Sequence, residues 1–181
     1  MKIIREPFPG CFLLQPRLFS DERGFFTEFF NKKTFEKTTG IVPGFVQDNL
    51  AASRKNVLRG MHFQKPPYQQ AKLVSCLQGA ILDIIVDIRP DSPTFLQYFS
   101  VELSGQNHYQ LYVPKGFAHG YLALSDHVLV YYKTDEFYRP ESDAGFRYND
   151  PQVKLPWNVP ENQLILSEKD KQLPFVKDIF R

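Results

Sequence analysis

Apolar residues of this chain fall in short runs, and most of these runs alternate between hydrophobic and polar positions. A period of two is typical of β-strands that bury one face. Clusters of Gly, Pro, Asn, Asp and Ser separate the runs and favour short turns. Many closely spaced strands without intervening helices predict an antiparallel sandwich or barrel. We expect strands at residues 25–30, 45–49, 57–64, 72–77, 80–89, 95–103, 108–113, 117–124 and 128–134, and a further apolar run at 10–19.

Two short helices complete the expected secondary structure. The segment KKTFEKTT, residues 32–39, follows Asn31 and precedes Gly40. Asparagine is a good N-cap and glycine a good helix terminator, so a helix is expected between them. In LSEKD, Ser167 and Asp170 have the spacing of a capping box, and a second helix is expected to begin there.

Composition excludes several classes of protein. Hydrophobic residues make up 43% of the chain, which is too many for a disordered protein. The formal net charge of +2 does not suggest nucleic-acid binding. No apolar run approaches the ~20 residues that span a membrane, and we expect no signal peptide and no membrane partner. Cys11 and Cys76 are far apart and are expected to be buried free thiols of a cytoplasmic protein.

Cofactor motifs are also missing from the sequence. It contains neither G-x-G-x-x-G nor a Walker loop, so we expect no dinucleotide cofactor and no ATP chemistry. It lacks the H-x-H pair with a following Glu that is typical of metal-binding cupins. His62 and His119 alone make a poor metal site, and we expect no metal.

Nine blocks of sequence carry a specific resemblance. They are DERGFFTE (21–28), QDN (47–49), VLRGMHFQ (57–64), QAKLV (70–74), VDIRPDSPTF (86–95), PKGFAHGY (114–121), YYKT (131–134), YRPESDAG (138–145) and LSEKD (166–170). In this order, and over nearly the whole chain, they closely resemble the dTDP-4-dehydrorhamnose 3,5-epimerase family.

The resemblance implies an all-β, cupin-type jelly-roll barrel with short peripheral helices. It implies a single domain over residues 1–181, with the jelly-roll core at about 45–135 and the N-terminal strands and C-terminal helical segment packed around it. It also implies a cofactor-independent, cytoplasmic homodimer. This isomerase would epimerise dTDP-4-dehydro-6-deoxy-D-glucose at C3 and C5. The product would enter dTDP-L-rhamnose synthesis for surface polysaccharide such as lipopolysaccharide O-antigen.

The same resemblance assigns roles to individual residues. His62 is the expected base, Tyr132 the acid, and Asp170 the partner of His62, while Lys72 lies at the sugar carbonyl. The expected substrate-binding residues are Arg23, Phe26, Glu28, Gln47, Asp48, Asn49, Arg59, Lys72, His119, Tyr138, Asp143 and Lys169. At position 143 we would expect Glu at least as often as Asp.

The chemistry fits these residue types. Inverting a carbon beside a ketone needs a base on one face, an acid on the other and a positive charge at the enolate oxygen. A neutral imidazole can act as the base, a phenol as the acid, and an ammonium group as the fixed charge. Without the family, the pattern favours a structural strand histidine at His62 over a catalytic one, and it does not distinguish a catalytic Tyr132 from a packed core tyrosine. Tyr138, beside a loop, is the best aromatic candidate for stacking on a base.

Sequence alone leaves three structural questions open. Alternation puts Tyr131 and Tyr132 on opposite faces without saying which face is inward. Strict alternation puts Arg59 and His62 on opposite faces too. A β-bulge at Gly60 would bring them to the same face; alternatively, they stay on opposite faces and one of them serves the site of a neighbouring subunit. Asp83 competes with Asp170 as the carboxylate partner of His62 and is alternatively a partner of Lys72.

Other function classes also remain. A related epimerase that inverts only C3 or only C5 would share the same blocks. A metal-dependent cupin would need a metal for turnover, and a non-catalytic sugar-binding jelly roll would bind its ligand without exchanging protons.

Overall fold

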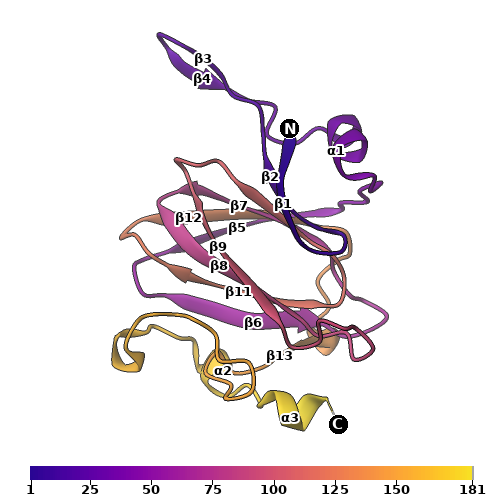
Figure 1. Ribbon diagram of the computed structural model, residues 1–181. Helices are drawn as coiled ribbons and strands as arrows, with labels where there is room; N and C mark the ends of the chain where they lie inside the picture. Colours follow the sequence, from indigo (N-terminus) through magenta and orange to yellow (C-terminus); the bar gives the residue numbers. More distant parts are fainter. Residues whose placement is uncertain (181) are drawn as a thin grey trace.

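Two facing antiparallel β-sheets form the body of the protein, whose computed structural model describes residues 1–180 (Figure 1). Arg181, the last residue of the expected domain, lies outside the described residues. The larger sheet contains, in spatial order, β1 (Lys2–Phe8), β2 (Cys11–Gln15), β10 (Gln110–Val113), β7 (Lys72–Gln78), β12 (Val128–Thr134) and β5 (Gln47–Ser53). The second sheet contains β13 (Asp143–Gly145), β6 (Leu58–Gln64), β11 (Phe117–Ala123), β8 (Ala80–Asp87) and β9 (Tyr98–Ser104).

Consecutive strands repeatedly cross from one sheet to the other, which gives a jelly-roll barrel and confirms the expected all-β fold. A separate hairpin of β3 (Phe19–Asp21) and β4 (Gly24–Phe26) projects from the barrel (Figure 1). The helices are α1 (Lys32–Thr39), α2 (Glu168–Lys171) and α3 (Val176–Ile179), with 3₁₀ turns η1 (Pro140–Ser142) and η2 (Glu161–Gln163).

Three apolar clusters hold these layers together. The first fills the barrel between the sheets, with Val74 and Val130 from one sheet and Ile81 and Ile85 from the other. The second lies under the outer face of β6, β8 and β11, where the C-terminal segment covers it. The third packs α1, through Phe35, against the outer face of β2 and β10. Because outer faces are covered too, β2 and β8 are largely buried on both sides.

The helix signals near the N-terminus are confirmed. The Asn31 side chain accepts a hydrogen bond from the Thr34 N–H at 3.1 Å, which caps α1. Gly40 ends the helix in the left-handed conformation, with φ of 75°.

The strand expected at residues 25–30 is wrong beyond residue 26. After β4 the chain leaves the hairpin, and the Phe29 and Phe30 rings pack on the body instead. Their ring centroids lie 6.1 Å from Tyr131 and 5.3 Å from Phe45, respectively. Sequence analysis also missed β1 and β13, and it ended β5 four residues early. The apolar pattern cannot separate a pairing strand from an aromatic segment that packs through its rings.

A β-bulge in β6 answers the question about Arg59 and His62. His62 pairs with His119 and Arg59 with Tyr121, so two residues of β6 oppose Gly120 alone. The extra residue breaks the alternation between the two positions. Arg59 and His62 therefore face the same side, the barrel interior. The bulge brings the two backbones very close together: a Cβ on Gly60 would lie 2.6 Å from the Gly120 Cα.

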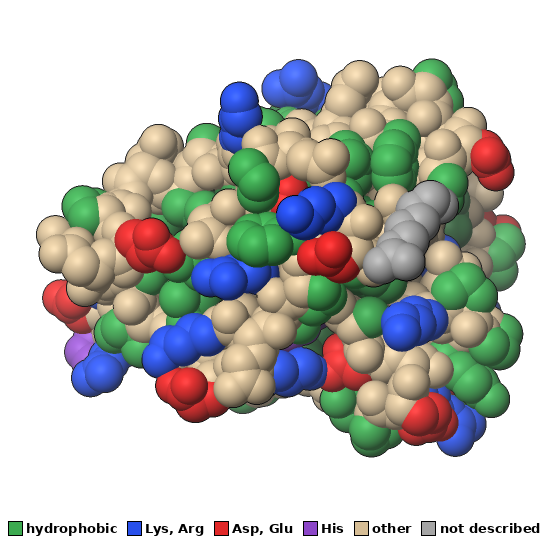
Figure 2. All heavy atoms as spheres, turned by 90° about the horizontal axis from the view of Figure 1, so that it is seen from below, with side chains coloured by type: hydrophobic (Ala, Val, Ile, Leu, Met, Phe, Trp, Pro, Cys, Tyr) green, Lys and Arg blue, Asp and Glu red, His purple; other side chains and the backbone are tan. Residues whose placement is uncertain are grey.

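Charges of both signs are interspersed over the face that includes the C-terminal segment (Figure 2), as a net charge of +2 leads one to expect. Among residues 1–180, no helix is long and apolar enough to cross a membrane.

We predict that Gly60→Ala lowers the free energy of unfolding by about 2 to 4 kcal/mol, because the new methyl group clashes with Gly120 and φ of +140° is strained for alanine. The matched control is Gly44→Ala, where a Cβ would meet no atom within 4 Å and φ is not left-handed. It should change the stability by less than about 1 kcal/mol. Urea unfolding measures both, and equal losses would contradict this view of the bulge.

Candidate active site

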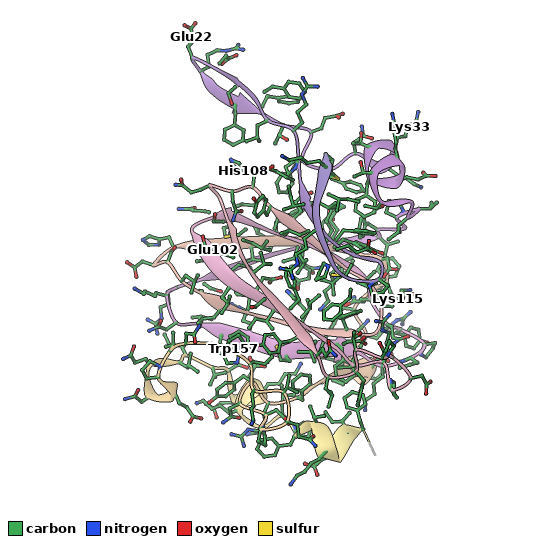
Figure 3. The ribbon with its side chains drawn as sticks, viewed as in Figure 1. Glu22, Lys33, Glu102, His108, Lys115 and Trp157 are labelled. Atoms are coloured by element: carbon green, nitrogen blue, oxygen red, sulfur yellow. The ribbon has the colours of Figure 1, made fainter. Side chains whose placement is uncertain are left out.

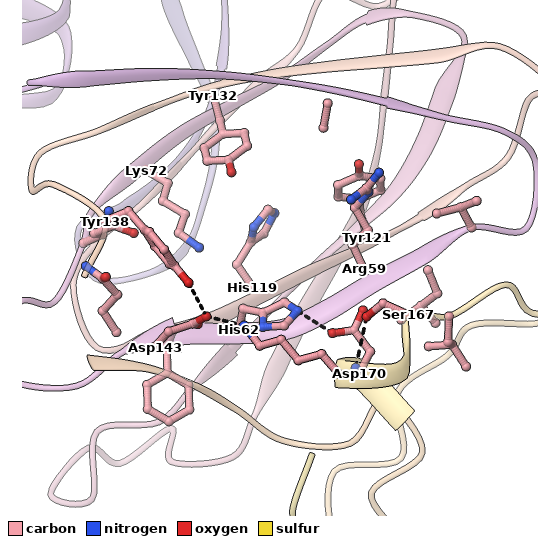
Figure 4. A pocket seen from close by; sticks show the side chains of 18 of the residues that line it. Arg59, His62, Lys72, His119, Tyr121, Tyr132, Tyr138, Asp143, Ser167 and Asp170 are labelled. Carbon is pink, nitrogen blue, oxygen red and sulfur yellow. Dashed lines mark hydrogen bonds and ion pairs between the residues drawn. The ribbon is translucent and has the colours of Figure 1, made fainter. Parts of the chain in front are cut away.

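One cavity of about 570 Å³ opens between the two sheets and the C-terminal segment (Figure 4). Four expected catalytic residues line it: His62 on β6, Lys72 on β7, Tyr132 on β12 and Asp170 on α2. Residues that are far apart in the sequence therefore share one chamber.

His62 is held by a carboxylate. Its Nε2 lies 2.8 Å from the Asp170 Oδ1, and the Asp170 side chain is only 5% exposed. The Asp170 backbone N–H donates to the Ser167 Oγ at 3.1 Å, so Ser167 caps α2 while the carboxylate faces the histidine. The capping motif thus sets the backbone of α2 and leaves the Asp170 side chain free to orient the ring. An imidazole whose Nε2–H is donated to Asp170 presents Nδ1 as its free lone pair.

Tyr132 reaches into the same cavity from the opposite sheet. Its phenol points down from β12 toward the floor that carries His62 (Figure 4). Tyr131 faces the other way, where its hydroxyl accepts a hydrogen bond from Lys133 at 3.2 Å. Burial raises the pKa of Tyr132 above its ordinary value of 10, and the neighbouring Tyr121 adds to this. The phenol therefore stays protonated at neutral pH.

Lys72 enters the cavity between these two walls (Figure 4). Burial lowers the pKa of its ammonium group to about 8, and the charges of Asp83 and Asp143 oppose this shift. Near neutral pH, the side chain supplies a positive charge in a site where water screens it poorly.

A second histidine–carboxylate pair contributes His119 to the cavity lining. The His119 Nε2 is 2.8 Å from the Asp83 Oδ1, and both side chains are buried. Asp83 is therefore the partner of His119 and not of His62. Its other oxygen, Oδ2, has no hydrogen-bond partner among the described residues. The Asp83 carboxylate raises the pKa of Lys72 and so opposes the effect of burial.

Arg59 lies at the exposed end of the cavity. Its Nη2 donates to the Ala52 carbonyl at 3.1 Å, and its Nε donates to the Ser53 Oγ at 3.3 Å. The Ser53 hydroxyl also lies 3.1 Å from the Tyr121 hydroxyl. These contacts orient the guanidinium group while leaving it accessible to an anionic ligand.

Three polar residues line the other rim of the cavity. The Tyr138 hydroxyl donates to the Asp143 Oδ2 at 2.8 Å, and Lys169 forms an ion pair with the same oxygen (Figure 4). Burial opposes ionisation of Asp143, but hydrogen bonds from Lys169 and Tyr138 outweigh it and lower its pKa. Asp143 therefore links Tyr138, in the loop before β13, to Lys169 on α2, and the longer side chain of a glutamate is not needed for this.

Six expected substrate-binding residues do not line this cavity. Arg23 and Phe26 belong to the projecting hairpin, and Glu28 follows it; Figure 3 shows the hairpin, with Glu22 at its tip, pointing away from the barrel. Arg23 forms an exposed ion pair with Asp21 at 2.6 Å. Asp48 faces outward, where Lys133 binds it at 2.6 Å.

Gln47 and Asn49 lie on the inward side of β5, but just outside the cavity lining. The Gln47 Nε2 donates to the Asn49 Oδ1 at 2.8 Å. Successive residues of one strand point to opposite faces, so Gln47 and Asn49 lie on one face and Asp48 lies on the other.

Sequence analysis missed four polar residues of the cavity, namely Tyr121, Gln64, Gln70 and Ser167. Alternation would have found the first two, because Tyr121 is two residues after His119 and Gln64 is two residues after His62. Gln70 lies in a loop and carried no comparable signal. Within residues 1–180, no three His, Cys, Asp or Glu side chains converge as ligands of a metal ion would.

Comparison with known proteins agrees with this geometry. The family model described as dTDP-4-dehydrorhamnose 3,5-epimerase matches residues 5–178. A protein of that name from Escherichia coli (strain K12) is 48% identical over 181 residues, which cover 100% of this chain and 97% of the relative.

Solved structures give the same result. The crystal structure of dTDP-4-dehydrorhamnose 3,5-epimerase from Bacillus anthracis, with TDP and PPi bound, has a TM-score of 0.94 and 50% identity, and covers 97% of this chain and 99% of that one. The epimerase from Legionella pneumophila in complex with dTDP-4-keto-L-rhamnose has a TM-score of 0.92 and 44% identity, covering 97% and 93%.

A jelly-roll barrel whose chamber combines a histidine–aspartate pair, a facing phenol and a lysine defines an acid–base isomerase. The chain belongs to the dTDP-4-dehydrorhamnose 3,5-epimerase family.

We predict that turnover falls as the pH rises through about 8, because the Lys72 ammonium group loses its proton there. Lys72→Arg keeps a positive charge up to about pH 12, so its residual activity should lack this alkaline decline. Lys72→Met should lose about 10²–10³ in kcat. Initial rates at several pH values measure these effects. If Lys72→Arg still lost activity above about pH 8, the decline would not come from deprotonation of Lys72.

Proposed function

We propose that this chain epimerises dTDP-4-dehydro-6-deoxy-D-glucose at C3 and C5 to dTDP-4-dehydro-L-rhamnose. The single observation that carries the proposal is the facing arrangement of His62, held by Asp170 on one wall, and Tyr132 on the other. A base and an acid on opposite walls are what inversion of a carbon centre requires.

His62 removes the proton in this mechanism. Asp170 takes the Nε2–H as a hydrogen bond, which fixes the ring tautomer and stabilises the imidazolium that forms. Nδ1 then abstracts the proton from the sugar carbon next to the ketone. The electron pair of the broken C–H bond forms a C=C bond to C4, and the π pair of the C4 carbonyl moves onto its oxygen, which gives an enolate.

Tyr132 returns a proton from the other side. The phenol gives its proton to the enolate carbon, and the carbonyl re-forms with the carbon inverted. Before the next inversion the phenolate takes a proton from water and the His62 imidazolium gives its proton to water. Because burial keeps the pKa of Tyr132 above its ordinary value, the phenol is a proton donor and a poor base at neutral pH.

Lys72 serves both inversions. C3 and C5 flank the same C4 carbonyl, so removing a proton from either carbon places negative charge on one oxygen. The Lys72 ammonium group beside that oxygen therefore stabilises both enolates. One lysine is enough for the inversion of both carbons. At the exposed end of the cavity, Arg59 binds the diphosphate through its guanidinium fork.

A homodimer is part of the proposal. Phe25 and Phe26 of the hairpin remain 56% and 67% exposed, although the Phe25 ring lies 4.8 Å from the His108 ring and the Phe26 ring 6.4 Å from the Phe19 ring. Large aromatic side chains that stay this exposed are typical of a surface that binds a partner. Arg23, Phe26 and Glu28 are expected to bind substrate but lie away from the cavity of their own chain. Both facts are explained if the hairpin of one copy reaches the cavity of its partner.

We also propose that one domain carries the whole activity, and that the protein works in the cytoplasm. Cys11 and Cys76 support the second point because both are buried free thiols. The product supplies dTDP-L-rhamnose for surface polysaccharide.

We predict that the wild-type protein in D₂O incorporates deuterium at both C3 and C5 of the substrate. His62→Ala should lower exchange at both carbons by about 10²–10⁴. Tyr132→Phe should retain exchange, because proton removal survives, while epimerised product falls by a similar factor. NMR and mass spectrometry of the sugar measure both quantities.

Other outcomes point elsewhere. Label at one carbon alone would indicate a monofunctional 3- or 5-epimerase. Loss of turnover on treatment with a chelator, restored by a metal ion, would favour a metal-dependent cupin. Wild-type exchange in His62→Ala would mean that another group is the base.

We predict that two inactive variants complement each other if the hairpin acts in the partner's site. In a mixed dimer of Arg23→Ala and His62→Ala, one of the two sites has both residues intact. Random mixing of equal amounts should therefore restore about a quarter of wild-type activity. Refolded mixtures and sedimentation analysis test this, and a monomer in solution or a mixture without activity would contradict it.

A further inference from the structure

Glutamine side chains hold the loop that carries Tyr138. Four consecutive residues of this loop, which follows β12, use a backbone group to bind one of three glutamines. Gln70 donates to the Glu136 carbonyl at 2.8 Å, Gln64 donates to the Phe137 carbonyl at 3.2 Å, Gln47 accepts from the Tyr138 N–H at 3.0 Å, and Gln64 accepts from the Arg139 N–H at 2.6 Å.

The three glutamines come from different parts of the barrel mouth. Gln47 begins β5, Gln64 ends β6 and Gln70 precedes β7. The loop is thus tied to both sheets at once, through side chains and not through strand pairing. Surface loops normally lack such anchoring, and fixing their backbone costs about 1–2 kcal/mol per residue.

Gln64 is the centre of this arrangement. It is 5% exposed, and its Nε2 also donates to the Tyr68 carbonyl at 2.6 Å. Both amide hydrogens and the amide oxygen are therefore in use. Gln64 lies two residues after His62, on the same inward face of β6.

The loop presents one aromatic ring to the cavity. Tyr138 is 50% exposed although its backbone is held on both sides, and its hydroxyl donates to Asp143. The ring stands at the rim, close to Lys72 in the view of Figure 4. An exposed ring on a fixed backbone is a preformed stacking surface, and a ligand that uses it does not have to order the loop on binding.

We propose that Gln64 is a positioning residue for substrate binding, which holds the Tyr138 backbone so that the ring is preset against the bound nucleotide sugar. The inference rests on the proposed function and adds a residue to it. Gln64 acts through Tyr138, and the proton transfers at His62 and Tyr132 do not depend on it.

The test separates KM from kcat. Gln64→Met keeps the volume of the side chain and removes all three backbone hydrogen bonds. It should raise KM for the nucleotide sugar about tenfold, while kcat and the rate of deuterium exchange at saturation stay within about threefold. Gln70→Met removes one bond to the same loop and should raise KM less. It also carries the test if Gln64→Met does not fold.

A double-mutant cycle identifies the route of the effect. In a Tyr138→Ala background, Gln64→Met should raise KM no further, because the ring it positions is gone. Ser92→Ala is the control for loop destabilisation. Its hydroxyl bonds Asp87 and Thr94 at 2.6 and 3.0 Å in a loop that contributes nothing to the cavity, so its loss should lower Tm and leave KM unchanged.

Two results would overturn the inference: a wild-type KM in Gln64→Met together with a lowered Tm, or a full KM effect that persists without the Tyr138 ring. The proposed function fails separately, if the wild-type protein exchanges no deuterium with the substrate. In that case the affinity for dTDP can still be measured by calorimetry in wild type and in Gln64→Met. Equal affinities would show that Gln64 does not position Tyr138 for ligand binding.

Discussion

The close approach of two backbones at Gly60 and Gly120 is the constraint on which the site depends. Only residues without a Cβ allow β6 and β11 to pair across the bulge, since added methyl groups would meet backbone or Met61 at under 3 Å. The bulge shifts the strand by one residue and turns Arg59 and His62 to the same side. Without it, the guanidinium group and the base would lie on opposite faces of the sheet.

The two sheets then supply opposite halves of the chemistry. The sheet that contains β6 provides His62, and the sheet that contains β7 and β12 provides Lys72 and Tyr132. A substrate between the sheets meets a base from one side and an acid from the other. The apolar cluster that fills the barrel beyond the cavity keeps the sheets apart and keeps water from the buried charges.

The C-terminal segment contributes through packing as well as chemistry. It covers the apolar outer face of β6, β8 and β11, and in doing so it brings α2 to the cavity. Ser167 caps this helix, and Asp170 reaches His62 while its neighbour Lys169 pairs with Asp143. A helix of four residues is not stable by itself, so the carboxylate is positioned by tertiary contacts.

The sequence by itself determined the strand-rich architecture, the capped helix at 32–39 and the residue types of the site. Alternation also established that Tyr131 and Tyr132 face opposite ways. Only the tertiary structure decided that Tyr132 faces inward, that Asp83 pairs with His119 and Asp170 with His62, and that the segment after residue 26 leaves its hairpin. Periodicity describes each strand relative to its own axis. Which residues meet depends on how separate strands pack, and that information is spread over the whole chain.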